Sequence, residues 1–126
     1  MPRKAVDVTD TELAILELLW ERAPETIRGI ASELYGEWTT AQYATVQSLL
    51  ERLEAKGCVK RDRRSFAHIF TAKIARADLI GQRLQDLAEK LCGGSWTPLL
   101  VQLVQRTRLS ARDREMLRKL IEQSKK

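Results

Sequence analysis

Residues 39–72 read TTAQYATVQSLLERLEAKGCVKRDRRSFAHIFTA, and their apolar period changes part of the way along. In the first half, apolar residues recur at i, i+3, i+4 and i+7, which is the spacing of one helix face: Val46, Leu49, Leu50 and Leu53. Thr39 and Gln42 have the spacing of a capping box, and Gly57 stands where a left-handed C-cap is expected. This pattern predicts a helix that begins near Thr40 and stops before Gly57.

The second half has a period of two, which is typical of strands. Two extended segments, Cys58–Arg61 and Phe66–Phe70, flank a polar corner at Asp62–Ser65. A helix followed at once by a basic hairpin is the plan of a winged helix-turn-helix. In that plan the helix enters a major groove, and the hairpin lies on neighbouring phosphates.

The preceding residues complete this plan. A capping-box pattern at Thr9 begins a helix that ends near Arg22. Glu25–Ile27 is a candidate third strand, and Arg28–Tyr35 a second helix. We therefore expect a mainly α (α+β) fold, with a winged-helix DNA-binding domain and its small antiparallel wing sheet over residues 1–72.

Residues 73–126 show no strand pattern and predict three helices with apolar stripes. Three such helices cannot bury their stripes among themselves as one compact core. We therefore expect a helical dimerisation region that pairs with a second copy of the chain, with packing against the N-terminal domain as the alternative. The residues expected at the dimer interface are Trp96, Leu99, Leu100, Leu103, Val104, Leu117, Leu120 and Ile121.

The outward face of the predicted recognition helix carries short or hydrogen-bonding side chains. Gln47 suits an adenine edge, and Thr45 offers a hydroxyl or a methyl group. Glu51 and Glu54 are poor neighbours for phosphates, so we expect only the N-terminal half of the helix to enter the groove. The candidate DNA-binding residues are Tyr43, Ala44, Thr45, Gln47, Ser48 and Arg52 of the helix and Arg61, Arg63 and Arg64 of the wing.

Charge and composition favour a nucleic-acid partner and disfavour an enzyme. The formal net charge is +5, and five cations fall within residues 56–64 against the single carboxylate of Asp62. His68 is the only histidine, and no nucleophile elbow or phosphate-binding glycine loop is present. Two cysteines, Cys58 and Cys92, are too few for a disulfide framework or a zinc site. We therefore expect no catalytic activity, no metal and no cofactor.

Targeting signals are not evident in the sequence. The N-terminal residues MPRKAVDVTD lack an apolar signal region, and no apolar run approaches the roughly 20 residues of a membrane span. We therefore expect a cytoplasmic protein without a membrane partner.

Several segments in a fixed order resemble the penicillinase-repressor (BlaI/MecI/CopY) family of bacterial regulators. They are LAILELLWE (13–21), ATVQSLLERLEAKG (44–57), the wing ending FAHIFTA, LCGGSWTPLLVQLV (91–104) and LSARDREMLRKLIE (109–122). The resemblance covers nearly all of the chain from Val8 to Gln123.

The resemblance implies a homodimeric repressor on a palindromic double-stranded operator, controlling antibiotic-resistance or stress genes. It also implies relief of repression by a regulatory protease, and the pair aligned with the family's cleavage site is Gln102-Leu103. The family often has lysine where this chain has Ala44, and the cysteine cluster of its copper-responsive members is absent. The alternative function is a winged-helix protein-interaction module within a larger assembly.

Overall fold

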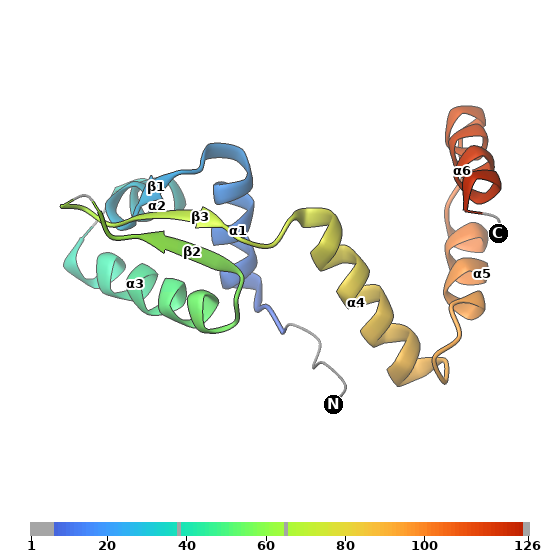
Figure 1. The fold of residues 1–126 in the computed structure, drawn as a ribbon, viewed down its shortest axis with the longest axis horizontal. Coiled ribbons are helices and arrows are strands. Elements are labelled where there is room, and N and C mark those ends of the chain that lie inside the picture. The colour runs from blue at the N-terminus through green and yellow to red at the C-terminus, as the bar shows by residue number, and fades with distance from the viewer. Residues whose placement is uncertain (1–6, 38, 65, 125–126) are drawn as a thin grey trace. The chain divides into compact units, whose positions relative to one another are not determined.

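Residues 39–72 form a helix and a two-stranded hairpin in the computed structural model, as their change of apolar period predicts (Figure 1). The structure describes residues 7–37, 39–64 and 66–124. The elements, in chain order, are α1 (Asp10–Arg22), β1 (Glu25–Thr26), α2 (Ile27–Tyr35), α3 (Thr40–Ala55), β2 (Val59–Asp62), β3 (Ile69–Ala72), α4 (Arg76–Leu91), α5 (Thr97–Arg106) and α6 (Ala111–Gln123).

Capping interactions fix where the helices begin. Thr9 and Glu12 form a reciprocal capping box at α1, and Thr39 and Gln42 form another at α3. The Oγ of Ser110 accepts a hydrogen bond from the amide of Asp113 at 3.0 Å and so caps α6. The predicted caps at Thr9 and Thr39 are confirmed.

The end of α3 requires glycine. Gly57 has a φ of +78°, in the left-handed region that glycine adopts without a steric penalty. The amide of Cys58 then bonds the carbonyl of Leu53 at 2.9 Å, and the chain turns directly into β2.

The three strands form an antiparallel sheet in the order β1-β3-β2. Phe70 lies opposite both Glu25 and Arg61 in the register, so β3 is the central strand. The predicted third strand is confirmed, but the second strand of the hairpin begins at Ile69 rather than at Phe66. The reason is that the Phe66 side chain is fully exposed, whereas Phe70 is fully buried and fixes the register.

The core of the N-terminal region lies between α1, α2, α3 and the sheet. Apolar side chains from each element contribute to it, and the four residues predicted on the inner face of α3 are all buried. This core continues into α4, because Leu79 is buried within it. The largest fully buried apolar side chains are Phe70, Ile15, Leu16, Leu19, Ile30, Leu50 and Leu53.

Polar contacts also attach the start of α4 to the winged helix. The indole Nε1 of Trp20 donates to the carbonyl oxygen of Ile74 at 2.9 Å, and the guanidinium of Arg76 lies over the Trp20 ring. Arg83 donates to the carbonyl oxygen of Val8 at 3.3 Å. The chain divides into a first compact unit of Met1–Arg83 and a second of Leu84–Lys126.

The second unit contains the end of α4 together with α5 and α6. Gly93 and Gly94, both with positive φ, follow the end of α4. No described residue of α5 or α6 is buried, although both helices carry regular apolar stripes. In this single chain the stripes therefore face solvent.

Candidate nucleic-acid interface

The outward face of α3 is open to solvent. Ala44, Gln47, Ser48 and Arg52 are exposed, and the side chains of Gln47, Ser48 and Arg52 have no hydrogen-bond or ion-pair partner among the described residues. The Thr45 hydroxyl instead donates to the carbonyl oxygen of Ala41 at 3.0 Å. That bond uses the hydroxyl proton and leaves the Thr45 methyl group and both oxygen lone pairs for an outside partner.

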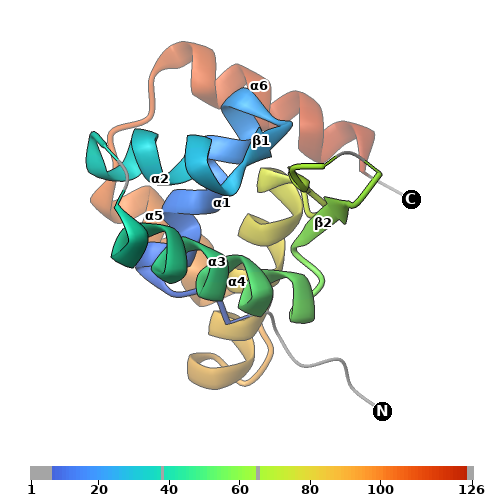
Figure 2. The same cartoon turned by 90° about the vertical axis from the view of Figure 1, so that its left-hand side faces the viewer.

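The hairpin follows α3 at its C-terminal end, and the two are seen together in Figure 2. Lys60, Arg63 and Arg64 are exposed, so the hairpin presents cations beside the helix. A helix with free polar groups beside a cationic hairpin can bind bases and phosphates at the same time. Of the wing residues that the sequence singles out, the structure therefore leaves Arg63 and Arg64 exposed beside α3.

Arg61 differs from the other wing arginines. Its side chain is only 13% exposed, and its Nη2 lies 3.1 Å from the Oε1 of Glu54 in α3. Its guanidinium carbon also lies 5.0 Å from the centre of the Phe70 ring. Arg61 is thus held between the helix and the sheet.

Asp62 binds Arg64 at the turn of the wing. The guanidinium of Arg64 donates to the carboxylate through Nε at 3.0 Å and Nη2 at 2.7 Å, and its amide donates to Oδ1 at 2.9 Å. These hydrogen bonds from Arg64, and its charge, lower the pKa of Asp62 to about 2. The Arg64 side chain nevertheless remains 91% exposed, so the pair is accessible to an outside anion.

A partly buried ion pair joins the end of α3 to the start of α1. The Nζ of Lys56 lies 2.6 Å from the Oε1 of Glu12, whose side chain is fully buried, and 2.6 Å from the carbonyl oxygen of Asp7. Burial raises the pKa of the Glu12 carboxyl, but the bonds from Lys56 and Thr9 outweigh it, and the net pKa is lowered. The ammonium of Lys56 therefore stabilises the fold of the domain. Its position within a basic run of the sequence does not indicate this role.

Replacing Lys56 with methionine should destabilise the protein by about 3 kcal/mol, because the buried Glu12 carboxylate loses its cation. Urea unfolding at neutral pH measures the change. The matched control is the double variant Glu12→Gln with Lys56→Met, which buries no charge and should recover part of the loss. A double variant less stable than the single one would contradict this role for the pair.

The loss of stability caused by Lys56→Met should depend on pH. A carboxyl whose pKa is lowered by folding stabilises the fold above its unfolded value and loses that contribution as the pH falls through its folded value. Without Lys56, burial raises the pKa of the Glu12 carboxyl in the variant, whereas in the native chain that pKa is lowered. The stability difference between the native chain and Lys56→Met should therefore be full at neutral pH and shrink as the pH falls towards 4.5, the ordinary value for Glu12, and below it. An equal difference at pH 7 and at roughly pH 3 would contradict this assignment.

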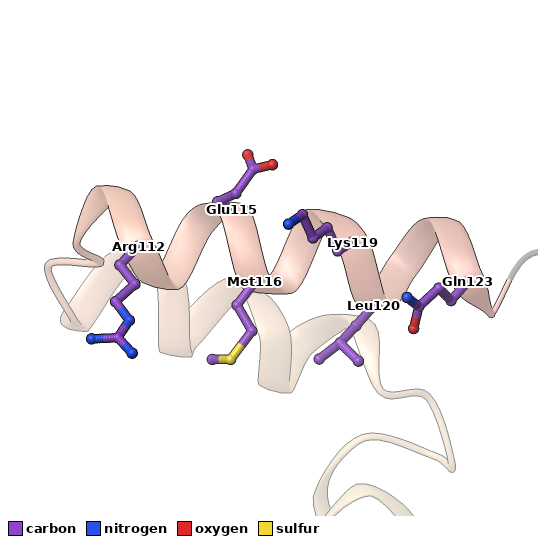
Figure 3. A pocket seen from close by; sticks show the side chains of 6 residues that line it. All are labelled: Arg112, Glu115, Met116, Lys119, Leu120 and Gln123. Atoms are coloured by element: carbon purple, nitrogen blue, oxygen red, sulfur yellow. The ribbon is translucent and has the colours of Figure 1, made fainter.

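The expected dimerisation residues lie on solvent-facing helix surfaces. Leu100, Leu103 and Val104 of α5 are exposed, as are Leu117, Leu120 and Ile121 of α6. Trp96, just before α5, is partly exposed, and Leu99 is half-buried. Figure 3 shows the six α6 side chains that line a pocket on this helix, among them the apolar Met116 and Leu120.

The candidate cleavage pair Gln102-Leu103 lies within α5, and both side chains are exposed. The Oε1 of Gln102 accepts a hydrogen bond from the Nε of Arg106 at 3.0 Å, one turn later. A protease binds its substrate in an extended form, so cutting here requires local opening of the helix.

Metal ligands, cysteines and membrane-spanning helices can also be checked in the described residues. Across residues 7–37, 39–64 and 66–124, no three His, Cys, Asp or Glu side chains gather as a metal site would require. Cys58 is buried and Cys92 partly so, and burial raises the pKa of the Cys58 thiol. Among the described helices, none combines the length and apolar character needed to cross a bilayer.

The fold, the exposed face of α3 and the cationic hairpin define a protein of the winged-helix class. A sequence model of the family described as penicillinase repressor matches residues 8–123 of the chain. The chain belongs to the penicillinase repressor family.

Individual relatives are similar to most of the chain. The transcriptional regulator BlaI of Mycobacterium tuberculosis is 32% identical over 105 residues, covering 82% of this chain and 75% of that protein. The penicillinase repressor of Bacillus licheniformis is 20% identical over 123 residues, covering 98% and 95%. A solution structure of the DNA-binding domain of the repressor BlaI aligns with a TM-score of 0.49 at 21% identity, covering 61% of this chain and 93% of that one.

Proposed function

We propose that this chain is a transcriptional repressor that binds a palindromic operator as a homodimer. The observation that carries the proposal is the outward face of α3, where Gln47 and Ser48 have no partner among the described residues. Such side chains on the exposed face of a helix, beside a cationic hairpin, fit the edges of bases in a major groove. Lys60, Arg63 and Arg64 then bind the flanking phosphates, and family membership supports the role of repressor.

Homodimerisation follows from the apolar stripes of α5 and α6. A monomer rarely exposes several large apolar side chains in regular rows, and such rows mark an interface. A second copy of the chain presents the same rows, so a two-fold pair buries both sets. The two α3 helices then meet two half-sites, which explains why the operator would be palindromic.

The regulated genes and the signal are proposed from the relatives. Two of them are named penicillinase repressors, from Bacillus licheniformis and Staphylococcus aureus. We propose that this chain likewise controls antibiotic-resistance or related stress genes, and that cleavage at Gln102-Leu103 by a regulatory protease relieves repression.

The direct test of function is equilibrium binding to duplex DNA over a series of salt concentrations. A duplex selected by the protein from a random pool serves as the operator, and a scrambled duplex of equal length serves as the control. We expect tight, selective binding whose logarithm falls linearly with the logarithm of salt concentration. Equal, salt-insensitive affinity for both duplexes would favour a protein-interaction module instead.

Changing Gln47 to alanine should relax sequence preference at one symmetric pair of operator positions. The expected loss is about 1–3 kcal/mol per half-site, because one pair of hydrogen bonds to a base edge disappears. Selection from a random pool with native and variant protein measures the change. Gln105→Ala, which removes the same amide from the exposed surface of α5, is the matched control. If the Gln47 variant selects the native sequence unchanged, Gln47 does not face the bases.

A further inference from the structure

Glu54 occupies an electrostatically unfavourable position. It lies in the last turn of α3, where the carbonyl groups give the helix end a partial negative charge that disfavours a carboxylate. It also lies next to the hairpin that the proposed function places on phosphates. A carboxylate in this position needs a compensating contact, and the structure supplies one in the wing.

That contact is made mainly with Arg61. One carboxylate oxygen of Glu54 lies 3.1 Å from the Nη2 of Arg61, and the other lies 3.9 Å from the Nη2 of Arg63. The two arginines are not equivalent, because the side chain of Arg61 is 13% exposed and that of Arg63 is 66% exposed. Arg61 is therefore the buried partner, and Arg63 remains on the surface.

The sheet closes the other side of Arg61. Arg61 lies opposite Phe70 in the β2–β3 register, and its guanidinium lies over the Phe70 ring. Phe70 is itself fully buried in the core. The chain of contacts from Glu54 through Arg61 to Phe70 thus connects the recognition helix, the edge strand of the wing and the central strand.

We infer that Glu54 is a positioning residue that fixes the wing to the recognition helix through Arg61, and that Arg61 is not a phosphate contact. This inference rests on the proposed function. The fixed pair sets the distance between the base-contacting face of α3 and the phosphate-contacting cations Arg63 and Arg64. A fixed distance favours a duplex whose groove shape places bases and phosphates correctly, so the pair contributes to specificity rather than to general affinity.

Salt dependence separates the two roles of arginine. An arginine that neutralises a phosphate releases counterions, and removing that arginine reduces the slope of the salt dependence by about 1 for each phosphate that is no longer neutralised. Arg63→Gln should show this reduction for each wing. Arg61→Gln should leave the slope at the native value while weakening binding to the selected duplex.

A double-mutant cycle tests whether Arg61 and Glu54 act as one unit. Each of Glu54→Gln and Arg61→Gln should lower the ratio of selected to scrambled affinity by about tenfold, and the double variant should be no worse than either. Glu54→Gln should also tighten binding to the scrambled duplex, since a negative charge leaves the interface. Glu54→Gln keeps the volume of the side chain, and thermal unfolding of every variant confirms that the fold is retained.

Two results would overturn the inference. An equal decrease of the salt slope in Arg61→Gln and Arg63→Gln would make Arg61 a phosphate contact. Additive decreases of specificity in the double variant would show that Glu54 does not act through Arg61. Failure of the proposed function looks different, because the native protein itself would then show no salt-dependent preference for duplex DNA.

Discussion

Replacing Leu100 with aspartate should convert the protein to a monomer and lower its operator affinity by roughly two to four orders of magnitude. Leu100 is 57% exposed in the single chain, so an aspartate there does not disturb the chain's own core. In a dimer built on the α5 stripe, the same aspartate would be an unpaired buried charge, which an interface does not tolerate. Once the dimer is lost, the two half-sites are bound independently.

Sedimentation measures the oligomeric state, and binding to the selected duplex measures the decrease in affinity. Gln105→Asp is the matched control, because it adds the same charge on the opposite, polar side of α5. The control should stay dimeric with native affinity. If the Leu100→Asp variant is still a dimer, the α5 stripe is not part of the interface. The same conclusion follows if the variant is as stable as the native protein and binds the selected duplex with native affinity.

Cutting the chain between Gln102 and Leu103 should lower operator affinity by a similar factor. The cut divides α5 and separates its first residues from Leu103, Val104 and the whole of α6. Each fragment keeps only part of the apolar surface, so the pairing between copies should be lost. The winged helix should stay folded, because its core cluster lies within residues 8–79. Operator affinity should then fall by roughly two to four orders of magnitude with unchanged base preference.

An engineered protease site at this pair allows the measurement on one preparation before and after cutting. The uncut form of the same variant is the control for the engineered residues themselves. Thermal unfolding of the cut protein should still show the transition of the N-terminal unit. Full-strength operator binding by the cut protein would show that loss of the dimer is not the off-switch.

Local sequence patterns predicted the winged helix because its elements are set by local chemistry. The caps at Thr9, Thr39 and Ser110 and the left-handed Gly57 determine where helices begin and end, whatever surrounds them. The start of β3 was predicted wrongly, because the alternation beginning at Phe66 does not show which of two aromatic residues is buried. Only packing against α1 and β2 selects Phe70.

The contacts that sequence patterns did not predict join residues far apart in the chain. Lys56 belongs to a basic run, yet its ammonium binds Glu12, 44 residues away. Leu79 is buried and its neighbour Ile80 is exposed, a difference that depends on packing against the winged helix. Glu54 was expected only to avoid DNA, and its bond to Arg61 depends on how the hairpin folds back on α3. A fragment intended to contain the DNA-binding domain should therefore extend to Arg83.

The central claim is that α3 and the wing form the surface that binds duplex DNA. Backbone amide chemical shifts of the labelled protein, followed during titration with the selected duplex, test it residue by residue. We predict that the large changes fall between the start and the middle of α3, around Thr45, Gln47 and Ser48, and in the hairpin around Arg63 and Arg64. Large changes confined to other surfaces, with α3 and the hairpin unaffected, would contradict it.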